Sequence, residues 1–292
     1  MSRNKDRLGL EEDTVFFDEN PPPAAAEPKQ DAASGGGFSW SVPTQFVTLP
    51  SGGKYYPENH PLHNKETVEI KFMTAKEEDI LTSKSLLKQG VAIDRLIESV
   101  LLDKTINVNS LLVGDKNALI VAARITGYGE EYETKVTCPS CGESDNFSFD
   151  LDPDRIKDMG SALEDYSAVQ TENNTFVVQV PMTKAKVECR LLTGADEMKT
   201  FKETQRKAKK KMTETMLTDQ FKSFIVSVNG DSSPLTVRSF IQAMPARDSR
   251  HLRTFYSDIT PNVDLSQIYE CSSCGYSADM EVPLTADFFW PR

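Results

Sequence analysis

The chain has 292 residues, of which 38% are hydrophobic and 26% are charged, and this composition is typical of a globular protein with one or two hydrophobic cores. The formal net charge of −11 disfavours proteins whose main task is to grip nucleic-acid phosphates. The longest strongly apolar stretch, residues 118–123, is too short to cross a membrane, and the N-terminus lacks the apolar run of a signal peptide. We therefore expect no membrane partner and synthesis in the cytoplasm, where thiols stay reduced.

Residues 1–37 predict an N-terminal arm that is disordered or extended. The segment is polar, contains a proline run and ends in three glycines, so it lacks the apolar surface needed to fold alone. Within it, Val15, Phe16 and Phe17 stand among acidic residues. We expect these three residues to dock on a partner protein, with a passive tail that carries incidental aromatic residues as the alternative.

Residues 38–292 predict a single α+β body that begins with strands and then turns helical. Pro50-Ser-Gly-Gly53 is a strong turn signal, and the chain beyond it alternates between apolar and polar residues as a strand does. Thr74 and Glu77 have the spacing of a capping box, which predicts the start of a helix. Three helices are expected in this part of the chain: one from Thr74 to the stop signal Gly90, one over residues 93–101, and one over residues 115–125 with Gly127 as its stop.

Two matching knuckles, at residues 132–151 and 268–284, each place a Cys-x-x-Cys-Gly motif between short alternating segments. Alternation on both sides of a glycine-containing turn predicts a β-hairpin. The glycine that follows the second cysteine can adopt the positive φ that such turns often need. The paired cysteines are Cys138 with Cys141, and Cys271 with Cys274.

These four cysteines predict a closed tetrahedral zinc site that joins the two knuckles. Cys141 and Cys271 are separated by 129 residues, so a folded segment must bring the motifs together. Closing a flexible loop of that length costs roughly 4 kcal/mol plus a constant, whereas a structural zinc ion contributes about 10–16 kcal/mol. Two local redox pairs or two unrelated thiol pairs are the alternatives, although redox motifs of this type usually occur singly and beside a βαβ pattern. Four cysteines leave no open coordination position, so we expect a structural zinc ion.

Residues 152–267 lie between the knuckles and predict a mixed segment that starts with strands. Residues 176–180 and 187–191 alternate as a pair of strands does. Cys189 falls on the apolar face of the second strand, so we expect it in the core and not as a nucleophile or a fifth ligand.

Helices should dominate residues 195–260, with Ile225 and Val228 on one apolar stripe. A basic run at residues 202–211 interrupts the acidic composition. We expect it to form a solvated helix face, with contact to an acidic neighbouring subunit as the alternative.

No motif in the sequence supports an enzyme or a small-molecule substrate. The three histidines, His60, His63 and His251, lie in no metalloprotease motif and beside no nucleophile signature. His60 and His63 have a spacing that could bind a metal, but a third ligand is missing, so we expect exposed loop residues. The sequence also lacks a phosphate-binding glycine loop.

The chain ends with three adjacent aromatic residues, Phe288, Phe289 and Trp290. Aromatic residues dominate both cores and binding surfaces, so this segment either closes the core beside the knuckles or anchors a partner protein. Both interpretations stay open at the level of the sequence.

The motifs follow one another in a distinctive order: Leu49-Pro-Ser-Gly-Gly-Lys-Tyr-Tyr-Pro57, Arg124-Ile-Thr-Gly-Tyr-Gly129, the two cysteine knuckles and Phe288-Phe289. This order, over roughly residues 43–290, resembles that of the baseplate hub proteins of T-even-like contractile-tailed bacteriophages. The resemblance implies a structural or assembly component of the tail baseplate and not an enzyme. It also implies a metal role for the four knuckle cysteines, whereas the long arm is not part of the shared pattern.

Our leading hypothesis is a zinc-stapled hub or hub-proximal subunit, with an α+β fold in which a small four-cysteine zinc ribbon joins helical clusters. Such a protein would be assembled in the host cytoplasm, reside in the virion tail and bind other baseplate and tail proteins. A transient assembly factor that is absent from the mature virion is the first alternative. A zinc-ribbon nucleic-acid binder that uses the basic run is the second.

Overall fold

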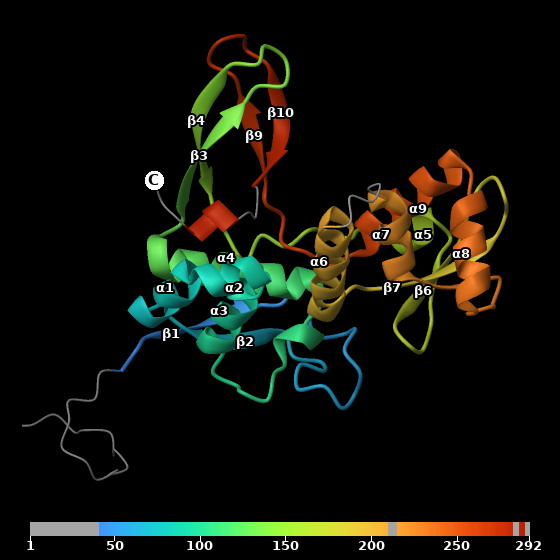
Figure 1. Ribbon diagram of the computed structural model, residues 1–292, viewed down its shortest axis with the longest axis horizontal. Helices are drawn as coiled ribbons and strands as arrows, with labels where there is room; N and C mark the ends of the chain where they lie inside the picture. Colours follow the sequence, from blue (N-terminus) through green and yellow to red (C-terminus); the bar gives the residue numbers. More distant parts are fainter. Residues whose placement is uncertain (1–40, 210–214, 283–285, 290–292) are drawn as a thin grey trace, which may run out of the picture. The chain divides into compact units, whose positions relative to one another are not determined.

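A long buried helix, α4 (Val113–Tyr128), receives contacts from elements of both halves of the chain (Figure 1). The computed structural model describes residues 41–209, 215–282 and 286–289. Residues 118–123 of α4 are all buried, which explains the strongly apolar stretch in the sequence. The fold is a mixed α+β arrangement with several small sheets, as the sequence predicts.

The elements follow the chain in two groups. The first group consists of β1 (Thr44–Thr48), β2 (Thr67–Lys71), α1 (Ala75–Thr82), α2 (Lys84–Gln89), α3 (Ala92–Val100), the 3₁₀ helix η1 (Val108–Ser110), α4, β3 (Glu131–Thr137) and β4 (Ser144–Asp150). The second group consists of α5 (Ala162–Asp165), β5 (Val169–Gln170), β6 (Thr175–Gln179), β7 (Lys186–Arg190), α6 (Gly194–Lys209), α7 (Met216–Phe224), β8 (Ile225–Val228), α8 (Pro234–Ala243), α9 (Ala246–Ile259), β9 (Ser266–Glu270), β10 (Ser277–Glu281) and the 3₁₀ helix η2 (Ala286–Phe289). The strands of the described residues form the antiparallel pairs β1–β2, β3–β4 and β9–β10 and the antiparallel sheet β5-β6-β7-β8.

The turn that follows β1 is fixed to α4 by a buried carboxylate. Asp115, in the first turn of α4, accepts hydrogen bonds from the Ser51 backbone N–H at 2.9 Å, the Ser51 hydroxyl at 2.6 Å and the Tyr56 hydroxyl at 2.8 Å. The Tyr56 hydroxyl in turn accepts from the backbone N–H of Leu112, the residue that precedes α4. The turn predicted at Pro50 is therefore confirmed, and its position is set by the start of α4.

The single helix expected from Thr74 to Gly90 is interrupted. Its start is confirmed, because the Thr74 backbone N–H donates to the Glu77 carboxylate at 3.0 Å, and its end is confirmed by the left-handed Gly90. Between them, Ser83 takes an extended conformation and separates α1 from α2. Ser83 and Ser85 share a hydroxyl hydrogen bond of 3.1 Å, and such polar side chains compete with the backbone bonds of a helix.

The expected stop at Gly127 is wrong, because α4 continues to Tyr128 and Gly129 caps it with a φ of +85°. Gly127 instead allows a close approach to the segment before α1. A Cβ at this position would lie 3.2 Å from the sulfur of Met73, so the glycine serves packing and not termination.

The helices expected to dominate residues 195–260 are interrupted by a strand. Ile225 and Val228, expected on a helical stripe, lie in β8, which pairs with β7. The Ser227 hydroxyl also donates to the Glu188 carboxylate across this pair at 2.6 Å. Three of the four residues of β8 are β-branched, which favours a strand. The two strands expected earlier are confirmed as β6 and β7, and Cys189 is a core residue with no exposed surface.

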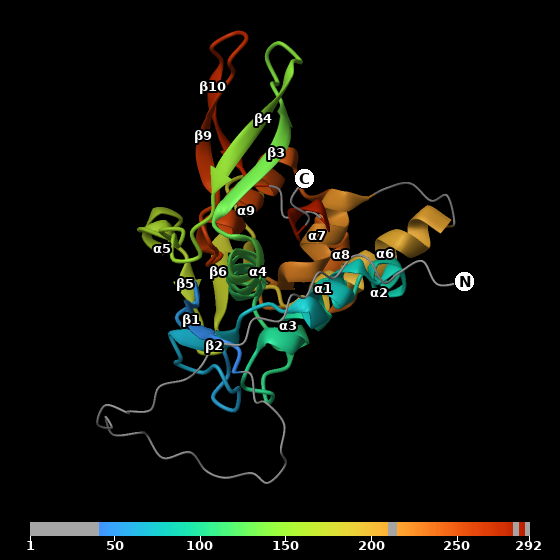
Figure 2. The ribbon, with the colours of Figure 1, turned by 90° about the vertical axis from the view of Figure 1, so that its left-hand side faces the viewer.

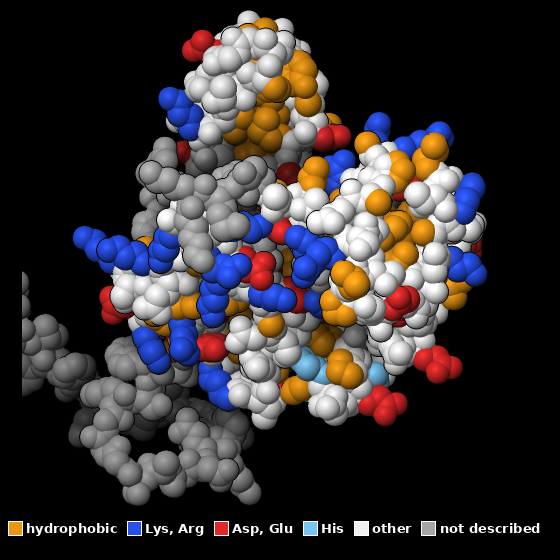
Figure 3. All heavy atoms as spheres, turned by 45° about the vertical axis from the view of Figure 1, so that its right-hand side comes forward, with side chains coloured by type: hydrophobic (Ala, Val, Ile, Leu, Met, Phe, Trp, Pro, Cys, Tyr) orange, Lys and Arg blue, Asp and Glu red, His pale blue; other side chains and the backbone are white. Residues whose placement is uncertain are grey.

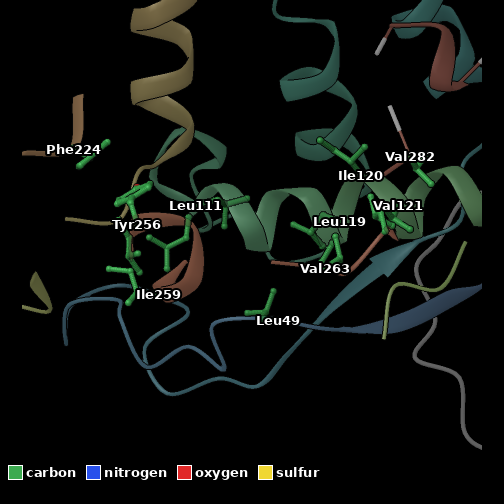
Figure 4. Packing of buried hydrophobic residues seen from close by; sticks show 14 of the residues in the cluster. Leu49, Leu111, Leu119, Ile120, Val121, Phe224, Tyr256, Ile259, Val263 and Val282 are labelled. Atoms are coloured by element: carbon green, nitrogen blue, oxygen red, sulfur yellow. The ribbon is translucent and has the colours of Figure 1, made fainter. Parts of the chain in front are cut away.

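One hydrophobic cluster connects these elements. In Figure 4, side chains of α4 such as Leu119 lie near Leu49, which follows β1, and near Val263, which precedes β9. The cluster also contains Phe224 and Tyr256, whose rings stack with centroids 4.1 Å apart. Segments far apart in the sequence therefore share one core.

Several expectations concern residues that the structure does not describe. The N-terminal arm, with Val15, Phe16 and Phe17, lies outside the described residues, as do Trp290 and the end of the basic run at residues 210–211. Among the described residues, no helix combines the length and the apolar character needed to cross a membrane.

Candidate metal centre

The two cysteine knuckles have the same backbone geometry. The Gly142 N–H donates to the Cys138 carbonyl at 2.9 Å, and the Gly275 N–H donates to the Cys271 carbonyl at 2.9 Å. Gly142 and Gly275 have φ values of +75° and +69°, and no heavy atom lies within 4 Å of where a Cβ would stand. Glycine is therefore favoured at both positions by the positive φ angle and not by a lack of space for a side chain. The predicted hairpins are confirmed as β3–β4 and β9–β10.

The hairpins bring the four predicted ligands together. Figures 1 and 2 both show β3–β4 and β9–β10 side by side, with their turns at the same end. The Sγ atoms of Cys138 and Cys274 are 3.8 Å apart, and those of Cys141 and Cys271 are 3.7 Å apart. All four Sγ atoms lie within 4.8 Å of one another, so the cluster could hold one metal ion.

The spacing of the sulfurs fits a tetrahedral metal and not a disulfide. Thiolates that bind zinc at about 2.3 Å in a tetrahedron are about 3.8 Å from one another. A disulfide would require about 2.05 Å between sulfurs, and the five cysteines are all free thiols. The donor set therefore matches that of a closed four-cysteine site.

The ionisation of the thiols also favours a cation. Hydrogen bonds from the backbone N–H groups of Cys274 and Ser273 lower the pKa of the Cys271 thiol to about 6, so this group is ionised near neutral pH. At Cys141, the backbone N–H of Glu143 lowers the pKa, but desolvation and the three neighbouring sulfurs outweigh it and raise the pKa to about 12. Sulfurs at this spacing repel one another when ionised, and a divalent cation removes that repulsion.

Polar contacts join the two hairpins independently of the sulfurs. The side-chain amide of Gln267 in β9 accepts from the Asp150 N–H at 3.1 Å and donates to the Asp150 carbonyl at 2.6 Å. Near the tips, the Ser272 hydroxyl donates to the Asp145 carboxylate. These residues were missed from the sequence, because a polar residue on a short strand carries no signal of its partner.

Aromatic residues pack between and below the hairpins. The rings of Phe147 and Tyr269, one from each hairpin, meet edge to face with centroids 5.5 Å apart. At the base, Tyr132 of β3 meets Phe288 of η2 at 5.1 Å. Phe288 and Phe289 are 0% and 1% exposed, so the structure places both in the core, which was one of the two alternatives left open by the sequence. Their burial within the chain leaves neither ring accessible to a partner.

Arg124 is a positioning residue that sequence analysis did not identify as such. It is 1% exposed, and its guanidinium donates to the carbonyl oxygens of Phe288 at 2.9 Å, Gly129 at 3.1 Å and Glu131 at 3.4 Å. It therefore joins α4 to the start of β3 and to η2. The only signal in the sequence is a charged residue directly after the apolar stretch of α4.

The histidines do not add ligands to this site. His60 and His63, expected as exposed loop residues, are half-buried, and each has a polar partner: the Ser110 hydroxyl at 2.8 Å and the Tyr56 carbonyl at 2.7 Å. Their role is to fix the loop after Tyr56. In the described part of the chain, the four cysteines are the one group of three or more histidine, cysteine or acidic residues that could hold a metal ion.

Comparison with models of protein families identifies the family of this chain. A family model described as T4 bacteriophage base plate protein matches residues 42–290. The chain belongs to this family. The match covers most of the chain, includes all four knuckle cysteines, and confirms the predicted resemblance at the level of the T4-like baseplate proteins. Comparisons with curated proteins and with solved structures found no significant match.

Membership of the T4-like baseplate family supports a structural role in a phage baseplate and a location in the virion tail. It also suggests interaction with other baseplate and tail proteins and a role that is not enzymatic. The four-cysteine cluster is consistent with that role, because a metal ion held by four cysteines has no open coordination position.

Proposed function

We propose that this T4-like baseplate protein is a hub or hub-proximal subunit in which one zinc ion staples two distant parts of the chain. Cys138, Cys141, Cys271 and Cys274 would hold the ion. The ion would supply no chemistry to a substrate. Its contribution is to fix the positions of two hairpins that other baseplate proteins contact.

The observation that carries this proposal is the convergence of four thiols from two hairpins, with 129 residues between Cys141 and Cys271. In the part of the chain that the structure describes, the two strands of each hairpin pair only with each other, and an isolated two-stranded hairpin is marginal in water. Hydrogen bonds from Gln267 and Ser272 help to join them, but each contributes only about 1 kcal/mol. A structural zinc ion contributes an order of magnitude more.

Metal content and assembly test the proposal together. The purified wild-type chain should carry one equivalent of zinc by elemental mass spectrometry. The Cys141→Ser variant should lose the zinc and, supplied to a phage that lacks this protein, should fail to restore baseplates. Cys189→Ala is the matched control, since it removes a buried thiol outside the cluster and should keep both properties. Normal particles assembled from the metal-free variant would contradict the proposal that zinc holds the two hairpins together.

The place of the protein in the particle needs a separate measurement. Mass spectrometry of purified virions should recover the protein in a fixed ratio to other baseplate proteins if it is a hub or hub-proximal subunit. Its absence from virions, together with its presence in assembly intermediates, would instead support the transient assembly factor.

A further inference from the structure

Helix α6 carries a basic face that lies next to α2. Lys199, Lys202, Arg206 and Lys209 follow one another at intervals of three, four and three residues, so they share one side of the helix. All four side chains are exposed. Lys202, Arg206 and Lys209 of the basic run therefore form a stripe with Lys199 on one side of α6, whereas Lys207 of the run pairs with Asp219.

The stripe is extended by α2. The Phe201 ring of α6 packs so closely on Gly90, the cap of α2, that a Cβ there would lie 2.2 Å from the ring. The Gln205 amide also donates to the Lys88 carbonyl at 3.4 Å. This contact brings the exposed Lys84 and Lys88 of α2 beside the stripe. The six residues define the basic surface: Lys84, Lys88, Lys199, Lys202, Arg206 and Lys209.

The basic surface has unusual charge and composition for this acidic chain. None of its six side chains forms an ion pair with the part of the chain that the structure describes. Leu87 and Phe201 stand among them and are 38% and 37% exposed. Figure 3 shows a face of the molecule on which Lys and Arg side chains outnumber acidic ones. Unpaired cations around exposed apolar side chains are suited to an acidic protein surface with an apolar centre.

The outer face of β9–β10 has the complementary chemistry. Ile268 is 71% exposed, and it pairs across the hairpin with Asp279. The neighbouring outward positions include Glu270 and Glu281, whereas Tyr269 points to the buried side. These two strands contain no Lys or Arg. Ile268, Glu270, Asp279 and Glu281 define the acidic hairpin face.

We propose that the basic surface of one copy binds the acidic hairpin face of a second copy. The charges are opposite, and Leu87 and Phe201 on one side and Ile268 on the other are exposed apolar side chains. Both surfaces are preformed, so little conformational entropy is lost on binding. The two surfaces differ from each other, so the contact is heterologous and propagates into a ring or an open chain. This inference goes beyond the proposed function and does not depend on which metal the cysteines hold.

A complementary charge swap in the full chain tests the proposal. One variant reverses the basic surface with Lys199→Glu, Lys202→Glu and Arg206→Glu. The other reverses the hairpin face with Glu270→Lys, Asp279→Lys and Glu281→Lys. Sedimentation should show that wild-type mass rises with concentration and that added salt opposes this rise. Each variant alone should associate at least about 100-fold more weakly, because like charges then meet.

Mixing the two variants provides the decisive measurement. The first variant keeps the native hairpin face and the second keeps the native basic surface, so an equimolar mixture should form mixed assemblies, beginning with a heterodimer that has one native contact. The two reversed surfaces are also opposite in charge, so they can add a charge-swapped contact. Reversal of three exposed bases elsewhere, Lys54→Glu, Arg238→Glu and Arg250→Glu, changes net charge equally and should leave association intact. Metal content and circular dichroism equal to wild type should accompany every variant, which separates this test from a failure of the metal centre.

Three results would overturn the proposal. Wild-type chain that stays monomeric at all concentrations, or a variant mixture without a heterodimer, would exclude the contact between copies. Loss of association on replacing Glu11, Glu12, Asp13, Asp18 and Glu19 with Ser would assign the basic surface to the N-terminal segment. Salt-dependent DNA binding that the basic-surface variant alone abolishes, without self-association of the wild type, would assign that surface to nucleic acid.

Discussion

Glu77 is a buried carboxylate in the first turn of α1, and the fold stabilises its ionised form. Burial by itself would raise its pKa, but hydrogen bonds from Lys71, Ser99 and Thr74 outweigh burial and lower the pKa to about 2. The unfolded chain, with the ordinary value of 4.5, therefore takes up the proton first as the pH falls. The stability that Glu77 contributes is complete above about pH 4.5 and is lost as the pH falls towards 2.

We expect Glu77→Gln to lower the free energy of unfolding by about 1–3 kcal/mol at pH 7, because buried donors lose their charged acceptor. The difference from wild type should shrink at pH 3, since the wild-type carboxylate then loses its advantage. Urea unfolding of both proteins at the two pH values measures this. Acid also protonates the cysteines in both proteins, so only the difference between them is informative. Asp79→Asn, an exposed change in the same helix, should show no such trend.

At the scale of single residues, the sequence predicts those whose chemistry is contained in a local motif. The spacing of the four cysteines predicts that they act as two pairs of ligands. The separation of three residues between Thr74 and Glu77 predicts the capping box. Arg124 and Asp115 could not be interpreted in this way, because their partners are carbonyl, N–H and hydroxyl groups that lie elsewhere in the chain. The structural role of a buried polar residue can be stated only once its hydrogen-bond partner is known.

At the scale of elements, the hairpin tips depend on a backbone conformation that glycine adopts without strain. Gly142 has a φ of +75° and open space around its α-carbon, so an added methyl group meets no neighbour and changes only the conformational energy. We expect Gly142→Ala to cost about 1–2 kcal/mol. That energy corresponds to a roughly 5–30-fold loss of zinc affinity, measured by competition with a chelator of known affinity.

Gly142→Asn is the matched comparison for this change. Asparagine tolerates the left-handed conformation better than alanine does, although its side chain is larger. The zinc affinity of the Asn variant should therefore lie between those of wild type and Gly142→Ala. An Asn variant that binds zinc less tightly than the Ala variant would show that side-chain size, and not the φ angle at position 142, determines the zinc affinity.

The elements missed from the sequence have two causes. Ile225 and Val228 fit a helical stripe in sequence, but pairing with β7 selects the strand. Ser83 takes an extended conformation inside a segment whose two ends were predicted, and a single serine leaves no periodic trace of such a break in the sequence. Periodicity indicates the type of a long isolated segment. Periodicity fails for a segment as short as four residues, which fits the period of a helix and that of a strand equally well. Pairing with a neighbouring strand then determines the secondary structure.

At the scale of the whole molecule, the four cysteines are placed to stabilise one region more than the rest. The core around α4 buries residues from both halves of the chain and does not need a metal to do so. The hairpins β3–β4 and β9–β10 have few buried residues toward their tips, so their order depends on the contact between them. Local stability in a protein need not be uniform, and such a region can open while the core stays folded.

Removal of the proposed zinc ion should therefore loosen the hairpins before the core. Treating the wild-type chain with a strong zinc chelator should raise hydrogen exchange at residues 131–150 and 266–281, which form the two hairpins. Exchange in α4 should stay slow, because its amides lie in a core built mainly from apolar side chains outside the knuckles, to which Cys138 and Cys271 contribute only two residues. Cys141→Ser should reproduce the chelated pattern without chelator, whereas Cys189→Ala should not. Equal loss of protection in α4 and in the hairpins would mean that the metal supports global folding and not the hairpins alone.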